Sequence, residues 1–365
     1  MSKFKLYFDL LKQTRCGLSL SKAAIWNSFK HFFVKRTDRI SISGLAPVLF
    51  QIYVTRRCQL NCPFCVVGKL PAGTNYQDYE LELPMLERML SQPLVQRALA
   101  VQLAGGEPTL HKQLPEIIRI VNSYGKVSAI ITNGLSLKDC YSDLLKSRLH
   151  DVQLSIYDTT FDRMLKLLPA INSIRPVHTS YVLTRSVLEN NSEQVERVVQ
   201  LCYESGCSWL KINLCQPGCD ETIYEDHTQY FELVRMIKDK YKKFKTFFPQ
   251  PAKRQIMSYK EKGCRFPWQT LTVNHKGDFI MCCAYASTPG EFGNIFDDEN
   301  NSLNSNQMRN LRSMLLSKDT NIAERCIGCP NLGGQFGSNL FSFRSEAIIL
   351  NNLSPPSLPI LSRTK

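Results

Sequence analysis

The sequence predicts an α/β fold, a partial (βα)6 TIM-like barrel of six parallel strands followed by a small C-terminal α+β domain. Two observations predict it. Between residues 47 and 213, short runs of β-branched and aromatic residues alternate with longer runs whose apolar residues recur at helical spacing. Such alternation favours a parallel sheet whose helices cross over between strands. After residue 213 the alternation ends, and a strand–turn–strand pattern around Gly277 follows.

The expected strands and helices alternate in chain order. We expect strands at 47–54, 99–103, 127–131, 151–156, 178–183 and 209–213. We expect helices between them at 83–90, 114–124, 137–148, 161–172 and 193–204. The strands are parallel in such a fold, so the residues that follow each strand gather at one end of the sheet. Catalytic residues of TIM-like barrels lie at that end.

Five segments are expected from the composition. They are a basic amphipathic helical N-terminal segment (1–46), the barrel (47–215), a basic linker with a long helix at 224–245 (216–254), the small α+β domain (255–330) and a C-terminal tail (331–365). The small domain is expected to contain a hairpin at 270–281 and a helix at 308–316.

The net charge of +13 suggests an acidic partner such as phosphate groups, anionic lipid or nucleic acid. No common nucleic-acid-binding motif is present, so a nucleic-acid partner is not expected. The amphipathic helix expected at 18–36 could pack on the protein's own core or lie on an anionic membrane surface. Fourteen cysteines, no secretory signal and no long apolar window favour a cytoplasmic protein, peripheral at the membrane if that helix binds lipid.

Three cysteines follow the first expected strand in a C-x3-C-x2-C pattern: Cys58, Cys62 and Cys65. Thiolates are soft ligands that select zinc, copper(I) or iron–sulfur clusters. A closed zinc site needs a fourth ligand, and the next histidine is as far away as His111. Three ligands suit a four-iron cluster that leaves one iron open to a chelating molecule. A zinc site with a remote fourth ligand, or unrelated cysteines, are the alternatives.

Polar or glycine-rich motifs also follow the later strands. Gly105 and Gly106 would let a ligand approach the backbone closely, and the Glu107 carboxylate could accept from an ammonium group. The other motif residues at strand ends are Thr132, Asn133, Ser155 and Arg185. Ordinary strand-to-helix turns would explain several of these residues equally well.

The cysteine triplet, with Phe64 just before its last cysteine, resembles the signature of the radical S-adenosylmethionine (SAM) enzymes. The resemblance implies that Cys58, Cys62 and Cys65 hold a [4Fe–4S] cluster whose open iron binds SAM. One electron from this cluster then cleaves SAM to methionine and a 5′-deoxyadenosyl radical. A reductant such as flavodoxin or ferredoxin is implied as an electron-donating partner.

The resemblance also assigns roles to the motifs at the other strand ends. Residues 105–107 correspond to the family motif that holds the methionyl amino group of SAM. Phe64 would help to position the adenine, mainly through its backbone. Thr132 and Asn133 would line the SAM end of the barrel. Ser155 would form a hydrogen bond to the ribose or the carboxylate of SAM, and Arg185 would supply a cation for that carboxylate.

A second cysteine set surrounds the expected hairpin and consists of Cys264, Cys282, Cys326 and Cys329. Its spacing resembles the abridged "twitch" form of the SPASM extension, which binds an auxiliary [4Fe–4S] cluster. A hairpin with one ligand on each side, closed by a later C-x2-C pair, would form a four-thiolate cage. Cys283 is adjacent to Cys282 and could replace it as the ligand. A zinc site is the alternative.

The implied activity is abstraction of a hydrogen atom from a small-molecule or peptide substrate, with oxidation (dehydrogenation) favoured. Cys215 and Cys219 follow the sixth strand, and a thiol there could return a hydrogen atom, which would make the enzyme a redox-neutral epimerase or isomerase. Carbon–carbon bond formation is a further alternative. A different class of function is a non-catalytic iron–sulfur or zinc protein that binds nucleic acid or membrane.

Overall fold

The structure is a computed structural model that describes most of the chain between residues 47 and 332. The described residues are 22, 26, 27, 40, 41, 47–65, 67, 75–215, 220–255, 264, 266–282, 289–297, 303–327, 329 and 332. Cys219, Cys283 and residues 333–365 of the C-terminal tail lie outside them.

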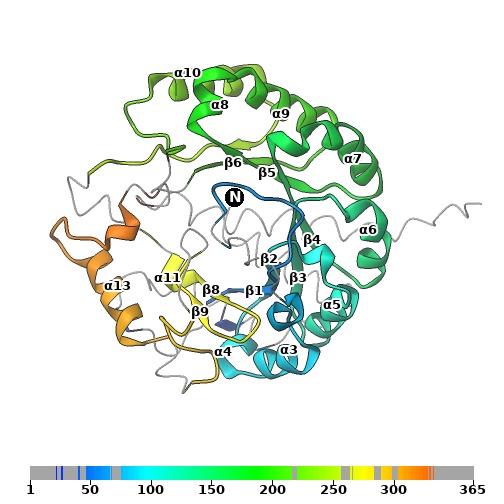
Figure 1. The fold of residues 1–365 in the computed structure, drawn as a ribbon, viewed down its shortest axis with the longest axis vertical. Helices are drawn as coiled ribbons and strands as arrows, with labels where there is room; N and C mark the ends of the chain where they lie inside the picture. The colour runs from blue at the N-terminus through cyan, green and yellow to red at the C-terminus, as the bar shows by residue number, and fades with distance from the viewer. Residues whose placement is uncertain are drawn as a thin grey trace, which may run out of the picture.

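One curved, mostly parallel sheet organises the fold, in the strand order β7-β6-β5-β4-β3-β2-β1-β8-β9 (Figure 1). Only β8 and β9 pair antiparallel. The strands are β1 Leu49–Thr55, β2 Ala100–Gly105, β3 Val127–Thr132, β4 Asp151–Ile156, β5 His178–Leu183, β6 Leu210–Leu214, β7 Thr246–Phe247, β8 Thr270–Val273 and β9 Phe279–Ile280. In the described part of the chain the two end strands, β7 and β9, do not pair, so the barrel is partial.

Helices cover the outer side of the curved sheet, as Figure 1 shows. The α-helices are α3 Leu83–Leu90, α4 Pro93–Gln96, α5 Leu114–Ser123, α6 Leu137–Lys146, α7 Phe161–Ile174, α8 Arg185–Asn190, α9 Glu193–Glu204, α10 Thr228–Lys240, α11 Phe266–Gln269 and α13 Asn306–Leu316. The 3-10 turns are η1 Tyr76–Tyr79, η2 Pro108–Leu110, η3 Asp158–Thr160 and η5 Glu324–Cys326. The main hydrophobic core joins the apolar faces of these helices to the outer face of the sheet.

The two faces of the sheet differ in polarity. Along β1, Phe50, Ile52 and Val54 are fully buried in the main core, whereas Gln51 points to the other, inner face. The amide of Gln51 donates to Gln102 Oε1 on β2 at 3.2 Å and accepts from Thr272 Oγ1 on β8 at 3.0 Å. These buried polar groups therefore form hydrogen bonds with one another across the neighbouring strands β2, β1 and β8.

The expected partial barrel is confirmed. The structure adds that the hairpin belongs to the barrel sheet. The strands near 270–273 and 279–280 form as expected, and Gly277 turns between them with a positive φ of 90°. However, β8 pairs in parallel with β1, so the hairpin extends the barrel sheet itself. The sequence also did not suggest α8 and β7, while the long helix expected at 224–245 is shorter, at Thr228–Lys240.

The N-terminal region contacts the barrel at one described point. Asn27 is buried, and its side-chain amide donates to the backbone oxygen of Arg97 at 3.0 Å. Residues 22, 26 and 27 are helical, and the rest of the helix expected at 18–36 lies outside the described residues. This contact agrees with docking on the protein's own core at that position.

A buried histidine connects β3 to the chain segment before β4. The His150 ring accepts a hydrogen bond from the backbone N–H of Ser128 through Nδ1 at 3.1 Å. Burial lowers the pKa of His150 to about 4, and the positive charge of Arg175 adds to this effect. The folded protein therefore holds His150 neutral at pH values where an unfolded histidine is half protonated.

We expect His150 to make the protein less stable in mild acid. Because its folded pKa lies below the unfolded value, the unfolded state binds the extra proton, and stability is lost as pH falls from about 6.5 towards 4, by up to about 3 kcal/mol. Urea unfolding of the wild-type protein and of His150→Asn at pH 7.5 and pH 5.0 would test this. The variant should lose less stability between the two pH values, and equal losses would contradict the expectation.

Candidate active site

The loop after β1 carries the cysteine triplet. Cys58 and Cys65 are exposed and Cys62 is half-buried. Burial raises the pKa of Cys62 to about 11, and the charges of Cys65 and Cys58 add to the rise. Desolvation likewise raises the pKa of Cys58. The thiols are thus close enough to act on one another electrostatically, and binding of a metal would displace their protons.

The base of this loop lies directly against the end of β2. The backbone N–H of Gly106 donates to the oxygen of Thr55 at 2.7 Å, and that of Glu107 donates to the oxygen of Arg57 at 2.6 Å. A Cβ atom on Gly106 would lie 2.2 Å from the Arg57 oxygen, and one on Gly105 would lie 2.4 Å from the Thr55 oxygen. Both glycines are therefore required by the contact between two strand ends, and this contact fixes the residue before Cys58.

The buried carboxylate of Glu107 connects the ends of β2 and β3. Its Oε1 accepts from Thr109 N, from Thr109 Oγ1 and from Thr132 Oγ1, at 3.0, 2.6 and 2.7 Å. Its Oε2 accepts from Asn133 N at 2.7 Å. A carboxylate offers about four acceptor positions, two on each oxygen. Oε2 therefore has room to accept a hydrogen bond from one further donor.

Asn133 also contacts the cysteine loop. Its side-chain Nδ2 lies 3.8 Å from Cys58 Sγ and donates to Gln59 Oε1 at 3.2 Å. Gln59 in turn donates to Ser136 Oγ at 2.9 Å. The end of β3 thus holds the first cysteine of the triplet in place. The sequence motif indicated Asn133 but gave no sign of Gln59 or Ser136.

An aromatic contact joins the loop to the end of β4. The Phe64 ring stacks on the Tyr157 ring, with centroids 6.2 Å apart and an angle of 27° between the planes. Burial raises the pKa of Tyr157, and the charge of Cys62 adds to the rise, so its hydroxyl stays protonated beside the thiols. Ser155 is buried, with its hydroxyl 3.2 Å from Ser180 Oγ on β5. Tyr157 had no predicted role.

Two candidate residues of the barrel remain, Arg185 and Cys215. Arg185 begins α8, is partly exposed, and its Nε lies 3.9 Å from Glu189 Oε1 on the same helix. Cys215 is buried directly after β6, at the same end of the sheet as the cysteine loop. No described contact joins Arg185 to the cysteine triplet, and its role as a cation for SAM stays a prediction.

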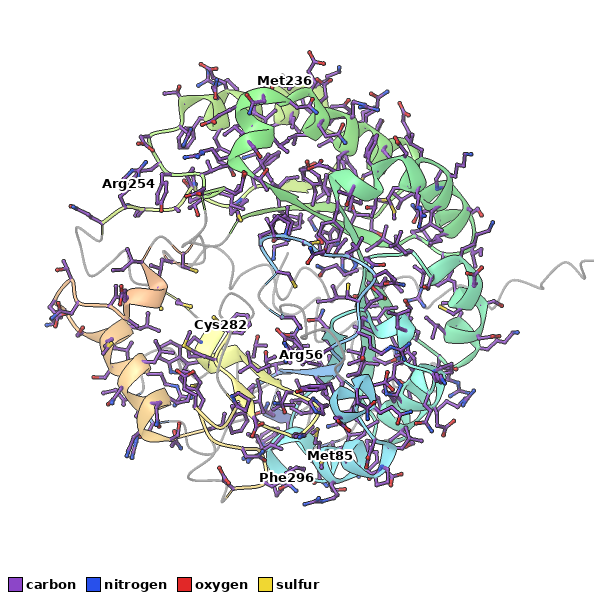
Figure 2. All side chains as sticks on the ribbon, in the orientation of Figure 1. Arg56, Met85, Met236, Arg254, Cys282 and Phe296 are labelled. Carbon is purple, nitrogen blue, oxygen red and sulfur yellow. The ribbon has the colours of Figure 1, made fainter. Side chains whose placement is uncertain are left out.

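Three of the four cysteines in the second set pack against the main core. Cys264, Cys282 and Cys326 are half-buried beside it, and Cys329 follows within one turn, with its N–H donating to Cys326 O at 3.1 Å. Figure 2 shows Cys282 and Phe296 on opposite sides of the β8–β9 hairpin. Phe296 is close to Gly277 in the turn, so Cys282 lies towards the start of β8.

Cys264 and Cys282 therefore lie towards the end of the sheet opposite to the cysteine triplet. Cys58 follows the C-terminal end of β1. Cys264 precedes α11, which runs directly into β8, and β8 is parallel to β1 with Leu49 paired to Thr270. The inner face of the sheet separates the two sets.

The donor chemistry of both sets suits iron–sulfur clusters. Among the described residues, no three His, Cys, Asp or Glu side chains are arranged to hold one metal ion. A four-iron cluster has a different requirement, because each thiolate binds its own iron and the sulfur atoms are held further apart. The triplet, whose thiols are close enough to affect one another but not gathered around one point, fits that requirement.

Comparisons with protein families match both parts of the chain. The model described as the radical SAM superfamily matches residues 52–214. The SPASM model, described as an iron–sulfur cluster-binding domain, matches residues 264–330. The first range contains the cysteine triplet and the second contains the cysteine quartet.

Curated relatives cover several chemistries. The chain is 26% identical to GTP 3′,8-cyclase of Helicobacter pylori, over 64% of this chain and 74% of that protein. It is 25% identical to PqqA peptide cyclase of Ruegeria pomeroyi, over 47% of this chain and about half (48%) of that protein. It is 21% identical to the antilisterial bacteriocin subtilosin biosynthesis protein AlbA of Bacillus subtilis, over 82% of this chain and 69% of that protein.

Solved structures share the fold. Streptococcus suis SuiB bound to S-adenosylmethionine has a TM-score of 0.59 at 18% identity and covers 84% of this chain and 80% of its own. The enzyme anSMEcpe with bound AdoMet has a TM-score of 0.53 at 15% identity and covers 84% of this chain and 96% of its own. Both likenesses agree with the partial barrel.

Across the described helices, none combines the length and the apolar character needed to cross a membrane.

We expect Gly106→Ala to disturb the first cysteine set. The new Cβ would force apart the ends of β1 and β2, so the loop should lose its anchor and the purified protein should contain less iron. Iron analysis after anaerobic purification measures this. Gly206→Ala is the control, because it carries the backbone strain of a positive φ of 74°, which Gly106 does not have, but no atom lies within 4 Å of its added Cβ. Equal iron in both variants would contradict the expectation.

Proposed function

Because the chain belongs to the radical SAM superfamily and carries a SPASM-type iron–sulfur cluster-binding domain, we propose that it oxidises a peptide substrate by two electrons. Cys58, Cys62 and Cys65 hold the cluster that binds SAM. Cys264, Cys282, Cys326 and Cys329 hold one auxiliary cluster, as in the twitch form of the domain. When bound, the first cluster and SAM supply a 5′-deoxyadenosyl radical, and the second supplies an electron acceptor.

The placement of the two cysteine sets carries this proposal. The triplet follows the C-terminal end of β1, whereas Cys264 and Cys282 lie towards the other end of the strands. A substrate on the inner face of the sheet can lose a hydrogen atom at the end where β1 and β2 terminate and lose an electron towards the other end. The balance is one hydrogen atom to 5′-deoxyadenosine, one electron to the auxiliary cluster and one proton released.

The chain's own residues bind and orient the reactants. The Oε2 atom of Glu107 accepts from the methionyl ammonium group, while its other bonds keep the ends of β2 and β3 together. Phe64 and Tyr157 form an aromatic wall beside the cysteine loop.

A peptide substrate is supported by two observations. The match to AlbA, a protein of subtilosin biosynthesis, covers 82% of this chain. The inner face of the sheet also offers side-chain amides and hydroxyls, such as Gln153 Nε2 donating to Ser180 Oγ at 3.3 Å, and half-buried Asn213. Such groups can bond to peptide N–H and C=O groups. A small polar molecule is the second candidate, since GTP 3′,8-cyclase is also a relative.

The two cysteine sets should be separable by mutation. Replacing Cys58, Cys62 and Cys65 together with Ala should remove about four irons per chain and all SAM cleavage. Cys264→Ala or Cys329→Ala should lose iron but leave some SAM cleavage, because the first cluster stays. Iron analysis and 5′-deoxyadenosine formation with dithionite measure both. Formation of 5′-deoxyadenosine by the triple variant would show that the triplet is not the SAM site, and intact iron without cleavage in the wild type would favour a non-catalytic protein.

The redox outcome can be read in deuterium oxide. Oxidation should give a product that is two electrons more oxidised, with one SAM consumed per product. An isomeric product carrying one deuterium at the reacting carbon, lost in Cys215→Ala, would instead show that a thiol returns a hydrogen atom. Cys202→Ala is the matched control. Cys202 is also buried, but it forms a hydrogen bond with Thr179 near the start of β5, away from the C-terminal ends of the strands. Mass spectrometry of the substrate and product separates the two outcomes.

A further inference from the structure

Arg312 on α13 is fully buried, with no solvent-exposed surface. Its Nε and one terminal nitrogen donate to the oxygen of Pro267, at 3.4 and 3.2 Å. The other terminal nitrogen donates to the oxygen of Ile40 at 3.2 Å and to Asn304 Oδ1 at 3.3 Å. Four hydrogen bonds thus hold the guanidinium, which has five N–H groups.

Every one of these acceptors is neutral. In the part of the chain that the structure describes, no carboxylate forms an ion pair with Arg312, and burial lowers its pKa to about 10. An arginine at that value is still charged at neutral pH. A buried charge without a counter-charge is costly, so this position calls for an anion close by.

A second buried cation, Lys126, can be compared with Arg312. Lys126 donates through Nζ to the backbone oxygens of Gln96 and Ala98, at the C-terminal end of α4. These two carbonyls lie at the end of α4 and just beyond it, and they are neutral, like the acceptors of Arg312. Burial also lowers the pKa of Lys126 to about 8, so it can lose its proton. Arg312, with its pKa of about 10, instead keeps its charge at neutral pH.

The second cysteine set supplies a matching anion. Pro267, which accepts twice from Arg312, follows Cys264 closely in the chain and precedes β8. Figure 1 shows α13 and α11 on the same side of the fold. A four-iron cluster with four thiolates carries net negative charge, which becomes larger on reduction.

We propose that the guanidinium of Arg312 is the buried counter-charge of the auxiliary cluster and raises the reduction potential of that cluster. This inference rests on the assignment of Cys264, Cys282, Cys326 and Cys329 as its ligands. The positive charge favours the reduced cluster, so the cluster accepts an electron from the substrate radical more readily. Arg312 is a positioning and tuning residue, since it contacts no reacting atom.

The test uses full-length protein in which Cys58, Cys62 and Cys65 are all Ala, so that only the auxiliary cluster is present. Its potential is measured by redox titration followed by electron paramagnetic resonance. Asn304→Asp puts a carboxylate against the guanidinium while keeping the hydrogen bond, and Arg312→Gln removes the charge. Both should shift the potential to more negative values, whereas Arg312→Lys should stay close to the parent.

Two controls separate charge from general disturbance. Asn306→Asp adds the same negative charge on the exposed side of α13, where water screens it, and should give a much smaller shift than Asn304→Asp. Lys126→Met removes a buried cation at a different place and should not move the potential.

The outcomes distinguish this inference from the proposed function. If the background protein contains no iron, the ligand assignment is wrong, and this inference with it. If iron is present and Asn304→Asp leaves the potential unchanged, Arg312 is only structural and the inference alone is overturned. If Arg312→Gln loses the cluster, the reduction potentials of Asn304→Asp and Asn306→Asp still decide whether Arg312 raises the potential.

Discussion

The contact between the ends of β1 and β2 is the constraint on which the active site depends. Gly105 and Gly106 leave no room for a side chain between the two strand ends, and the backbone N–H groups of Gly106 and Glu107 donate to the oxygens of Thr55 and Arg57. The cysteine loop starts one residue later. Any shift between these strands would therefore move the first cysteine relative to the end of β3, where Asn133 holds it. The position of a metal-binding loop is thus set by the packing of backbone against backbone.

This constraint changes the interpretation of the Gly-Gly-Glu sequence. The motif suggested a surface that a ligand approaches, and the structure shows that it first of all joins three strands. Glu107 uses Oε1 for Thr109 and Thr132 and uses Oε2 for Asn133, so a single buried carboxylate connects the ends of β2 and β3. In the proposed enzyme, binding of SAM and alignment of the sheet would depend on the same residue. A substitution of Glu107 would therefore affect the structure and the binding of SAM together, so the two effects could not be separated.

Much of the fold could be predicted because its signals are local. Each strand is a short apolar run and each helix has one apolar side, so the alternation is visible in the sequence. The pairing of β8 with β1 could not be predicted, because hydrogen bonds such as that from Thr272 to Gln51 join residues far apart in the chain. Tyr157 was missed for the same reason, since its role depends on stacking against Phe64. The helix α8 was missed because six residues give too short an apolar pattern.

The position of β8 has a consequence for synthesis of the chain. Gln51 and Thr272, which bond across β1 and β8, are separated by 221 positions. While the ribosome is making the barrel, the outer edge of β1 has no neighbour, and its N–H and C=O groups are available to other strands. The edge is closed only after residues 270–273 emerge. A nascent chain therefore carries its iron-binding loop on an open strand edge for most of its synthesis, and chaperones or rapid cluster insertion would protect it during that interval.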